Sequence, residues 1–175
     1  MKVRIGFVSN SSSSGFIVGF EKGKLPKSVE KIQDLLFGND KQISIYDKTI
    51  QTDQAAKTVW DDLQKAKPMT DAEIANELEH FGGWDCTGKV SFPKEIKYDD
   101  FKKPKKDGGW EYCDWDQYEI EVKKRGMNCM LMFRKQYPNF DFFHFEYGDE
   151  DGDYFCVMEH GGIFDNVLHL KISHH

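Results

Sequence analysis

Residues 4–20 read Arg-Ile-Gly-Phe-Val-Ser-Asn-Ser-Ser-Ser-Ser-Gly-Phe-Ile-Val-Gly-Phe, and the rest of the chain is organised around this stretch. Residues 2–8 alternate apolar with polar or small side chains, a pattern that predicts a strand. Residues 9–15 are a polar tract typical of a loop, and residues 16–20 form a second apolar run. Two strands joined by a short polar loop usually pair, so we predict an N-terminal β-hairpin.

The middle of the chain carries helical patterns. Apolar side chains at helical spacing predict helices over residues 28–37, 53–66, 70–82 and 116–136, and residues 42–46 are predicted to form a short strand. Ser28 is a suitable N-cap for the first helix, and Thr70 with Glu73 forms the sequence signature of a capping box. In the last helix, Gly126 is expected to cost about 1 kcal/mol relative to Ala. Met127, Met130 and Met132 are expected to fill gaps in the core.

The C-terminal part is predicted to be a β-meander. Strands are expected over residues 139–147, 154–160 and 168–173, with glycine-containing turns between them. Together with the N-terminal hairpin, this gives one antiparallel sheet with the helical middle block packed on it, an α+β fold. We predict a single domain over residues 1–175, with an irregular excursion at residues 84–110 that holds two prolines and a lysine cluster.

Composition limits the function classes. The 175 residues include 30 acidic and 24 basic side chains, a net charge of −6, so a partner bound through its phosphate backbone, such as a nucleic acid, is not expected. No apolar run reaches the ~18 residues of a membrane span, so no membrane is expected. The four cysteines form no Cys-x-x-Cys pair, which argues against a zinc ribbon and for reduced thiols in a cytoplasm.

The polar tract is the first candidate site. Ser9, Asn10, Ser11, Ser12, Ser13 and Ser14 offer hydroxyls and closely approaching backbone N–H groups, and such a loop can hold an anion, with Arg4 as the countercharge. The tract lacks the Gly-Lys-[Ser/Thr] ending of a P-loop. The alternative is a hairpin loop whose hydroxyls satisfy its own backbone. The sequence leaves both interpretations open.

Histidines near the C-terminus are the second candidate. If His144, His160 and His169 converge on one sheet face, with Glu146 or Glu159 near them, they can form an acid–base or metal site. The alternative is that they are isolated strand histidines, and His174 and His175 at the chain end resemble a cloning remnant. No metal or cofactor is assigned from the sequence.

The run from Arg4 to Phe16 resembles an N-terminal signature of small uncharacterised proteins from tailed bacteriophages and bacteria, Arg-x-Gly-Phe-Val-Ser-Asn-Ser-Ser-Ser-Ser-Ser-Phe. This chain departs from that pattern at Gly15, where a fifth serine is usual. The resemblance covers about 13 residues and implies kinship and a phage or prophage setting in a bacterial cytoplasm. No activity is attached to the signature.

These observations lead to two hypotheses. The first is a phage or prophage accessory protein that acts without catalysis by binding a host or phage protein. The second is a binding domain for phosphate or a nucleotide, or an enzyme, that uses the serine-rich loop. Whether the chain is an enzyme stays open at this point.

Overall fold

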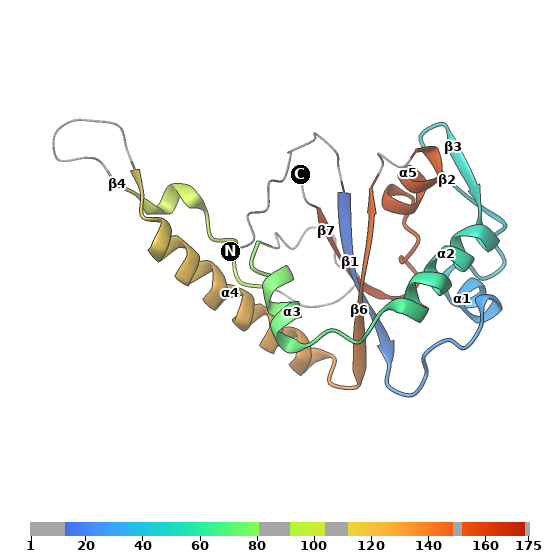
Figure 1. Ribbon diagram of the computed structural model, residues 1–175, viewed down its shortest axis with the longest axis horizontal. Coiled ribbons are helices and arrows are strands. Elements are labelled where there is room, and N and C mark those ends of the chain that lie inside the picture. Colours follow the sequence, from blue (N-terminus) through green and yellow to red (C-terminus); the bar gives the residue numbers. More distant parts are fainter. Residues whose placement is uncertain (1–12, 81–91, 104–111, 149–151, 174–175) are drawn as a thin grey trace.

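A three-stranded antiparallel sheet forms the centre of the fold, in the order β6–β1–β7 (Figure 1). The computed structural model describes residues 13–80, 92–103, 112–148 and 152–173. β1 spans Ser13–Glu21, β6 spans Phe140–Gly148 and β7 spans Leu168–Ser173. β1 pairs with β6 along one edge and with β7 along the other. The first strand of the described chain is therefore enclosed by the two strands that come last.

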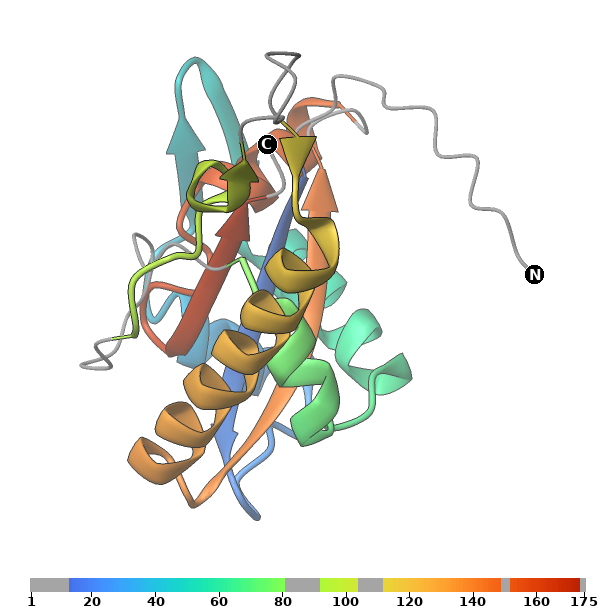
Figure 2. The ribbon, with the colours of Figure 1, turned by 90° about the vertical axis from the view of Figure 1, so that its left-hand side faces the viewer.

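Helices cover both faces of this sheet, as Figure 1 and Figure 2 show. One face carries α1 (Val29–Leu36), α2 (Thr52–Lys65), α5 (Asp153–His160) and the hairpin of β2 (Gln42–Ile45) and β3 (Lys48–Gln51). The other face carries α3 (Asp71–Glu77) and α4 (Trp115–Gln136). The α+β class, with helices packed on an antiparallel sheet, is confirmed.

Burial on both faces explains the continuous apolar run of β1, because each side chain meets a core on its own side. Phe16 and Val18 belong to the core beneath α1, α2 and α5, whereas Ile17 belongs to the core beneath α3 and α4. Gly19 lies on the same side as Ile17. A Cβ there would lie 2.8 Å from Cε1 of Phe142, so the missing side chain makes room for that ring.

β1 does not pair in the way that the expected N-terminal hairpin requires. Its expected partner, residues 2–8, lies outside the described residues. The two edges of β1 are taken by β6, along Ser13–Glu21, and by β7, along residues 14–19. Ser13 and Ser14, expected in the loop, begin the strand. Along residues 14–19 both edges of β1 are hydrogen-bonded, so no edge remains there for a hairpin partner.

The middle helices form as predicted. The Oγ of Ser28 accepts a hydrogen bond from the backbone N of Lys31 at 3.3 Å, which caps α1. Thr70 and Glu73 complete the predicted capping box at the start of α3. α3 ends at Glu77 rather than near residue 82.

The segment predicted as a strand over residues 154–160 is a helix, α5. Its sequence, Tyr-Phe-Cys-Val-Met-Glu-His, is a short apolar run, and periodicity alone cannot distinguish a buried strand from a buried helical turn in such a run. Gly152 precedes the helix with a positive φ of 97°, a conformation that favours glycine. The C-terminal meander is therefore two strands separated by a helix.

α4 crosses the sheet in direct contact with α3 (Figure 2). A Cβ on Gly126 would lie 2.3 Å from the backbone oxygen of Ala75, a distance that no side chain tolerates. The glycine that interrupts the helical pattern is therefore the residue that allows the two helix backbones to approach.

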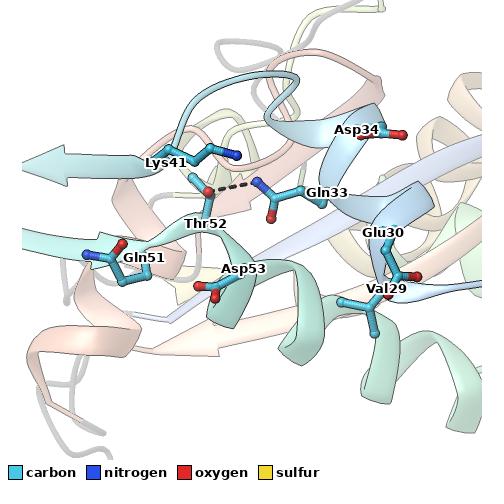
Figure 3. A pocket seen from close by; sticks show the side chains of 8 residues that line it. All are labelled: Val29, Glu30, Gln33, Asp34, Lys41, Gln51, Thr52 and Asp53. Carbon is cyan, nitrogen blue, oxygen red and sulfur yellow. Dashed lines mark hydrogen bonds between the residues drawn. The ribbon is translucent and has the colours of Figure 1, made fainter.

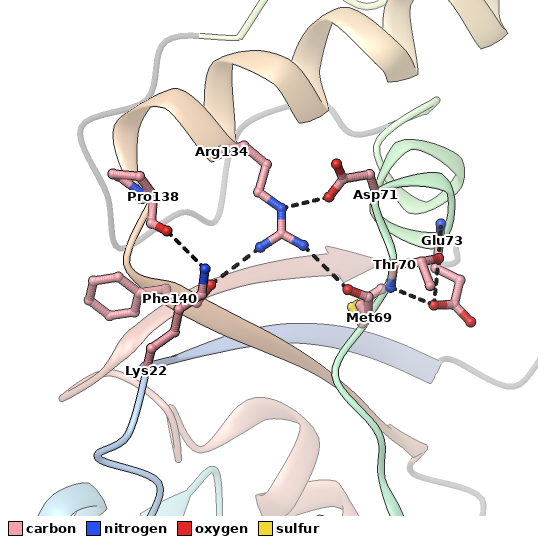
Figure 4. A network of polar contacts seen from close by, with 8 residues as sticks. All are labelled: Lys22, Met69, Thr70, Asp71, Glu73, Arg134, Pro138 and Phe140. Atoms are coloured by element: carbon pink, nitrogen blue, oxygen red, sulfur yellow. Dashed lines mark hydrogen bonds and ion pairs between the residues drawn. The ribbon is translucent and has the colours of Figure 1, made fainter.

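Arg134 ties the end of α4 to its surroundings (Figure 4). Its Nε donates to Oδ1 of Asp71 at 2.8 Å, and its two terminal nitrogens donate to the carbonyl oxygens of Phe140 and Met69, each at 3.3 Å. Met69 is in turn joined to the sheet, because its backbone N donates to the carbonyl of Phe142 at 2.7 Å. One guanidinium thus connects α4, the start of α3 and β6.

The expected excursion at residues 84–110 is described only in part. It contains the short 3₁₀ helix η1 (Tyr98–Phe101) and β4 (Lys102–Lys103), which pairs with β5 (Tyr112–Cys113). Within the described ranges, no helix combines the length and the apolar character needed to cross a membrane.

Candidate functional site

Three of the predicted site residues meet in one buried cluster. Oγ of Ser14 in β1 donates to Oε1 of Glu159 in α5 at 2.9 Å. The other carboxyl oxygen of Glu159 lies 3.5 Å from Nε2 of His160. Ser14 and Glu159 are 0% and 1% exposed, whereas the His160 side chain is 22% exposed. We call these residues the Ser14–Glu159–His160 cluster.

The β2–β3 hairpin reaches this cluster. Tyr46, in its two-residue turn, has a φ of +55° and is 80% exposed. Its ring lies edge-on to the His160 ring, with 6.3 Å between the centroids. A bulky residue in the left-handed region is unusual, and the turn places an aromatic ring in solvent beside the outermost member of the cluster.

The interior around Ser14 is closed. Tyr147 lies opposite Ser14 in the β1–β6 register, and its hydroxyl donates to Oδ2 of Asp62 at 3.5 Å. Burial, and then the negative charge of Asp62, raise the pKa of Tyr147. Since Ser14 is buried and its hydroxyl is engaged by Glu159, this serine is not a nucleophile presented to a substrate.

The remaining predicted histidines do not join the cluster. His169, in β7, lies on the same sheet face, but the rings of Phe16 and Phe164 lie beside it at 6.4 and 6.3 Å, and its Nδ1 is 3.2 Å from the carbonyl oxygen of Val167. His144 pairs with Ile17 on the opposite face, beneath α3 and α4. The convergence considered for His144, His160 and His169 therefore does not occur. His144 faces Ile17 and His169 faces Val18, and successive side chains of a strand point to opposite faces.

Of the other predicted site residues, Ser13 is described by the structure. Arg4, Ser9, Asn10, Ser11 and Ser12 lie outside the described residues. Ser13 begins β1, next to Ser14. In the part of the chain that the structure describes, no three His, Cys, Asp or Glu side chains are grouped so as to hold a metal ion.

A pocket of about 420 Å³ lies where α1 and α2 begin (Figure 3). It is lined by Val29, Glu30, Gln33, Asp34, Lys41, Gln51, Thr52 and Asp53. Within it, Nε2 of Gln33 donates to Oγ1 of Thr52 at 2.8 Å, and Thr52 donates to the carbonyl of Asp40 at 2.7 Å. Three carboxylates face one ammonium group in this lining, so this pocket does not suit a phosphate.

α4 carries two apolar stripes with the same spacing. Val122, Cys129 and Phe133 stand at positions i, i+7 and i+11, and all are buried. Cys129 and Phe133 belong to the core beneath α3 and α4. Ile120, Met127 and Leu131 repeat that spacing two residues earlier, about 200° around the helix. These three side chains are 57%, 47% and 58% exposed, and we call them the outer stripe of α4.

The sequence-based prediction places Met127, Met130 and Met132 in the core, and this assignment hides the outer stripe. Met130 is buried as expected, but Met127 and Met132 are exposed. The sequence signal for the outer stripe is the second i, i+7, i+11 repeat of apolar residues. A helix that packs on one side needs only one such stripe, so the second one indicates exposed apolar surface.

Aromatic side chains gather at the N-terminal end of α4, where Trp115 stands seven residues before Val122 and therefore on the same side of the helix. Trp115 is 57% exposed and packs against Tyr98 and Tyr118 at ring distances of 5.1 and 5.9 Å. A second hollow, of about 360 Å³, opens here between the end of α3 and α4, and Trp115, Tyr118 and Val122 are among the residues that line it. Exposed apolar side chains of the chain thus gather on α4.

Comparison with protein-family models, with curated proteins and with solved structures finds no match to this chain.

Proposed function

We propose that this chain is an interaction protein that acts by binding another protein chain through the outer face of α4, in the phage or prophage setting that its N-terminal signature implies. The observation that carries the proposal is the outer stripe: three apolar side chains, each about half exposed, aligned on a 22-residue helix. An exposed apolar stripe on an otherwise well-packed protein is typical of interaction sites.

The packing of α4 supports this role. Its inner face is held by the Gly126 approach to α3 and by the bonds of Arg134, so the helix presents a rigid outer surface. A rigid helix face loses little conformational entropy on binding, which favours its use as a contact surface. The Ser14–Glu159–His160 cluster, by contrast, joins elements of the fold, and its serine and glutamate are closed to a partner.

The test compares three versions of the chain as bait in lysate from a bacterial host, with and without phage infection. The native chain is expected to retain a specific set of proteins that the double variant Ile120→Asp, Leu131→Asp does not retain. Leu25→Asp, Leu35→Asp is the matched control, because it introduces the same charges at two other exposed leucines. If all three baits retain the same proteins and the native chain does not associate with itself, the outer face of α4 is not the contact surface and the proposal fails.

A further inference from the structure

We infer that the protein chain bound by the outer face of α4 is a second copy of this chain, packed antiparallel across a two-fold axis. This inference rests on the proposed function, since it names the partner of the same surface. It is carried by the way charge and apolar side chains are distributed along the helix.

The charges of α4 are separated by sign. Its first seven residues hold the carboxylates Asp116, Glu119 and Glu121, and the exposed residues that follow include Lys123, Lys124 and Lys135. This polarity suits the dipole of the helix itself. Glu119 and Glu121 pair with Lys123 and Lys124 of the same helix, at 3.3 and 3.5 Å. Asp116 near one end and Lys135 near the other then form the charge pair that joins two copies when the second helix runs in the opposite direction.

The apolar residues obey the same symmetry. A two-fold axis midway between positions 125 and 126 places Ile120 opposite Leu131 of the second copy and Met127 opposite the aliphatic stem of Lys124. It also places Asp116 opposite Lys135. Each of these pairings occurs twice, as an interface between identical surfaces requires.

A parallel arrangement lacks this fit. It would set the carboxylates of Asp116, Glu119 and Glu121 against their own copies, and like charges in contact oppose association. At 1.5 Å per residue, Ile120 and Leu131 are about 16 Å apart along the helix axis. The Ile120–Leu131 contact and its symmetry equivalent therefore lie on either side of the two-fold axis. A contact built on one helix from each copy is small for a permanent dimer, and we expect dissociation in the micromolar range.

Sedimentation velocity of the untagged full chain tests the inference. The chain concentration should run from about 1 µM to 1 mM, because this range covers dissociation constants in the micromolar range. The native chain is expected to shift from monomer to dimer across this range. Ile120→Asp, Leu131→Asp should weaken dimerisation at least tenfold, about 1.4 kcal/mol or more, while Leu25→Asp, Leu35→Asp should leave it unchanged. Circular dichroism verifies that each variant is folded.

A charge exchange distinguishes this geometry from a non-specific apolar contact. Asp116→Lys alone should weaken the dimer, because it sets two cations opposite each other, and adding Lys135→Asp should restore it. Three results would each overturn the inference. The native chain could stay monomeric over the whole concentration range, Ile120→Asp, Leu131→Asp could leave dimerisation unchanged, or adding Lys135→Asp to Asp116→Lys could fail to restore the dimer. If the native chain is monomeric but the bait Ile120→Asp, Leu131→Asp loses a protein that the native bait retains, the inference fails and the proposed function stands. If the native chain is monomeric and all three baits retain the same proteins, both fail.

Discussion

Oγ of Ser14 donates a 2.9 Å hydrogen bond to Oε1 of Glu159, which joins the start of the central strand to the last turn of α5 across 145 positions of sequence. Both side chains are sealed from solvent. A buried carboxyl group depends on its few polar partners, so this contact is expected to matter more for stability than a surface hydrogen bond would.

Replacement of Ser14 by alanine tests that contact. Ser14→Ala leaves Oε1 of Glu159 buried without its donor, and we expect the free energy of unfolding to fall by about 1–3 kcal/mol. Urea denaturation measures the change. Ser13→Ala, next to it in β1 and only half-buried, is the control and should change stability by less than about 0.5 kcal/mol. Equal denaturation midpoints for Ser14→Ala and the native chain would show that the contact contributes nothing.

Gly126→Ala reverses the usual helix preference. Alanine is intrinsically better than glycine in a helix by about 1 kcal/mol. Here its Cβ would lie 2.3 Å from the backbone oxygen of Ala75, so α3 and α4 must move apart. We expect a net loss of about 1–3 kcal/mol by chemical denaturation, the usual cost of overpacking. Asn128→Ala, at an exposed position of the same helix, should be neutral or stabilising, and a stabilising Gly126→Ala would contradict the close approach.

Arg134→Lys keeps the charge but loses the planar fork that reaches Asp71, Phe140 and Met69 at once. We expect a loss of about 1–2 kcal/mol, since two backbone carbonyls lose a donor. Thermal and urea unfolding measure it. Lys123→Met is the control, because its ion pair with Glu119 is about two-thirds exposed on both sides and such pairs contribute little. Indistinguishable effects of the two substitutions would mean that the Arg134 bonds do not hold α4 in place.

Glu73 gives a prediction for pH. The backbone N–H and then the hydroxyl of Thr70 bond the carboxylate of Glu73 and lower its pKa below the ordinary value of 4.5. The carboxylate therefore stabilises the fold above about pH 4.5, and this contribution is lost as the pH falls through the lowered pKa. Glu73→Gln keeps a side chain that suits a capping box but does not titrate. The urea midpoint of the native chain should exceed that of Glu73→Gln at pH 7, and the difference should shrink on acidification. A difference that grows as the pH falls would refute this account of the capping box.

Local patterns in the sequence predicted most of the elements. Ser28 and the Thr70–Glu73 pair marked helix starts correctly, because a cap is made by residues three positions apart and needs no tertiary contact. The alternation of β6 was equally plain, with Phe143, Phe145 and Tyr147 on one face. The serine tract was harder to interpret, because its composition is compatible with a loop and with the edge of a strand.

What the sequence determined by itself was therefore the set of elements whose causes are local: the caps, the apolar periodicity and the α+β class. Only the tertiary structure decided that β1 lies between β6 and β7, that residues 153–160 are helical, and that Ser14 meets Glu159 while His144 faces the other core. Only it showed which apolar stripe of α4 is covered and which is exposed. The physical reason is that burial depends on what packs against a segment, and partners 100 or more residues away leave no trace in the segment's own pattern.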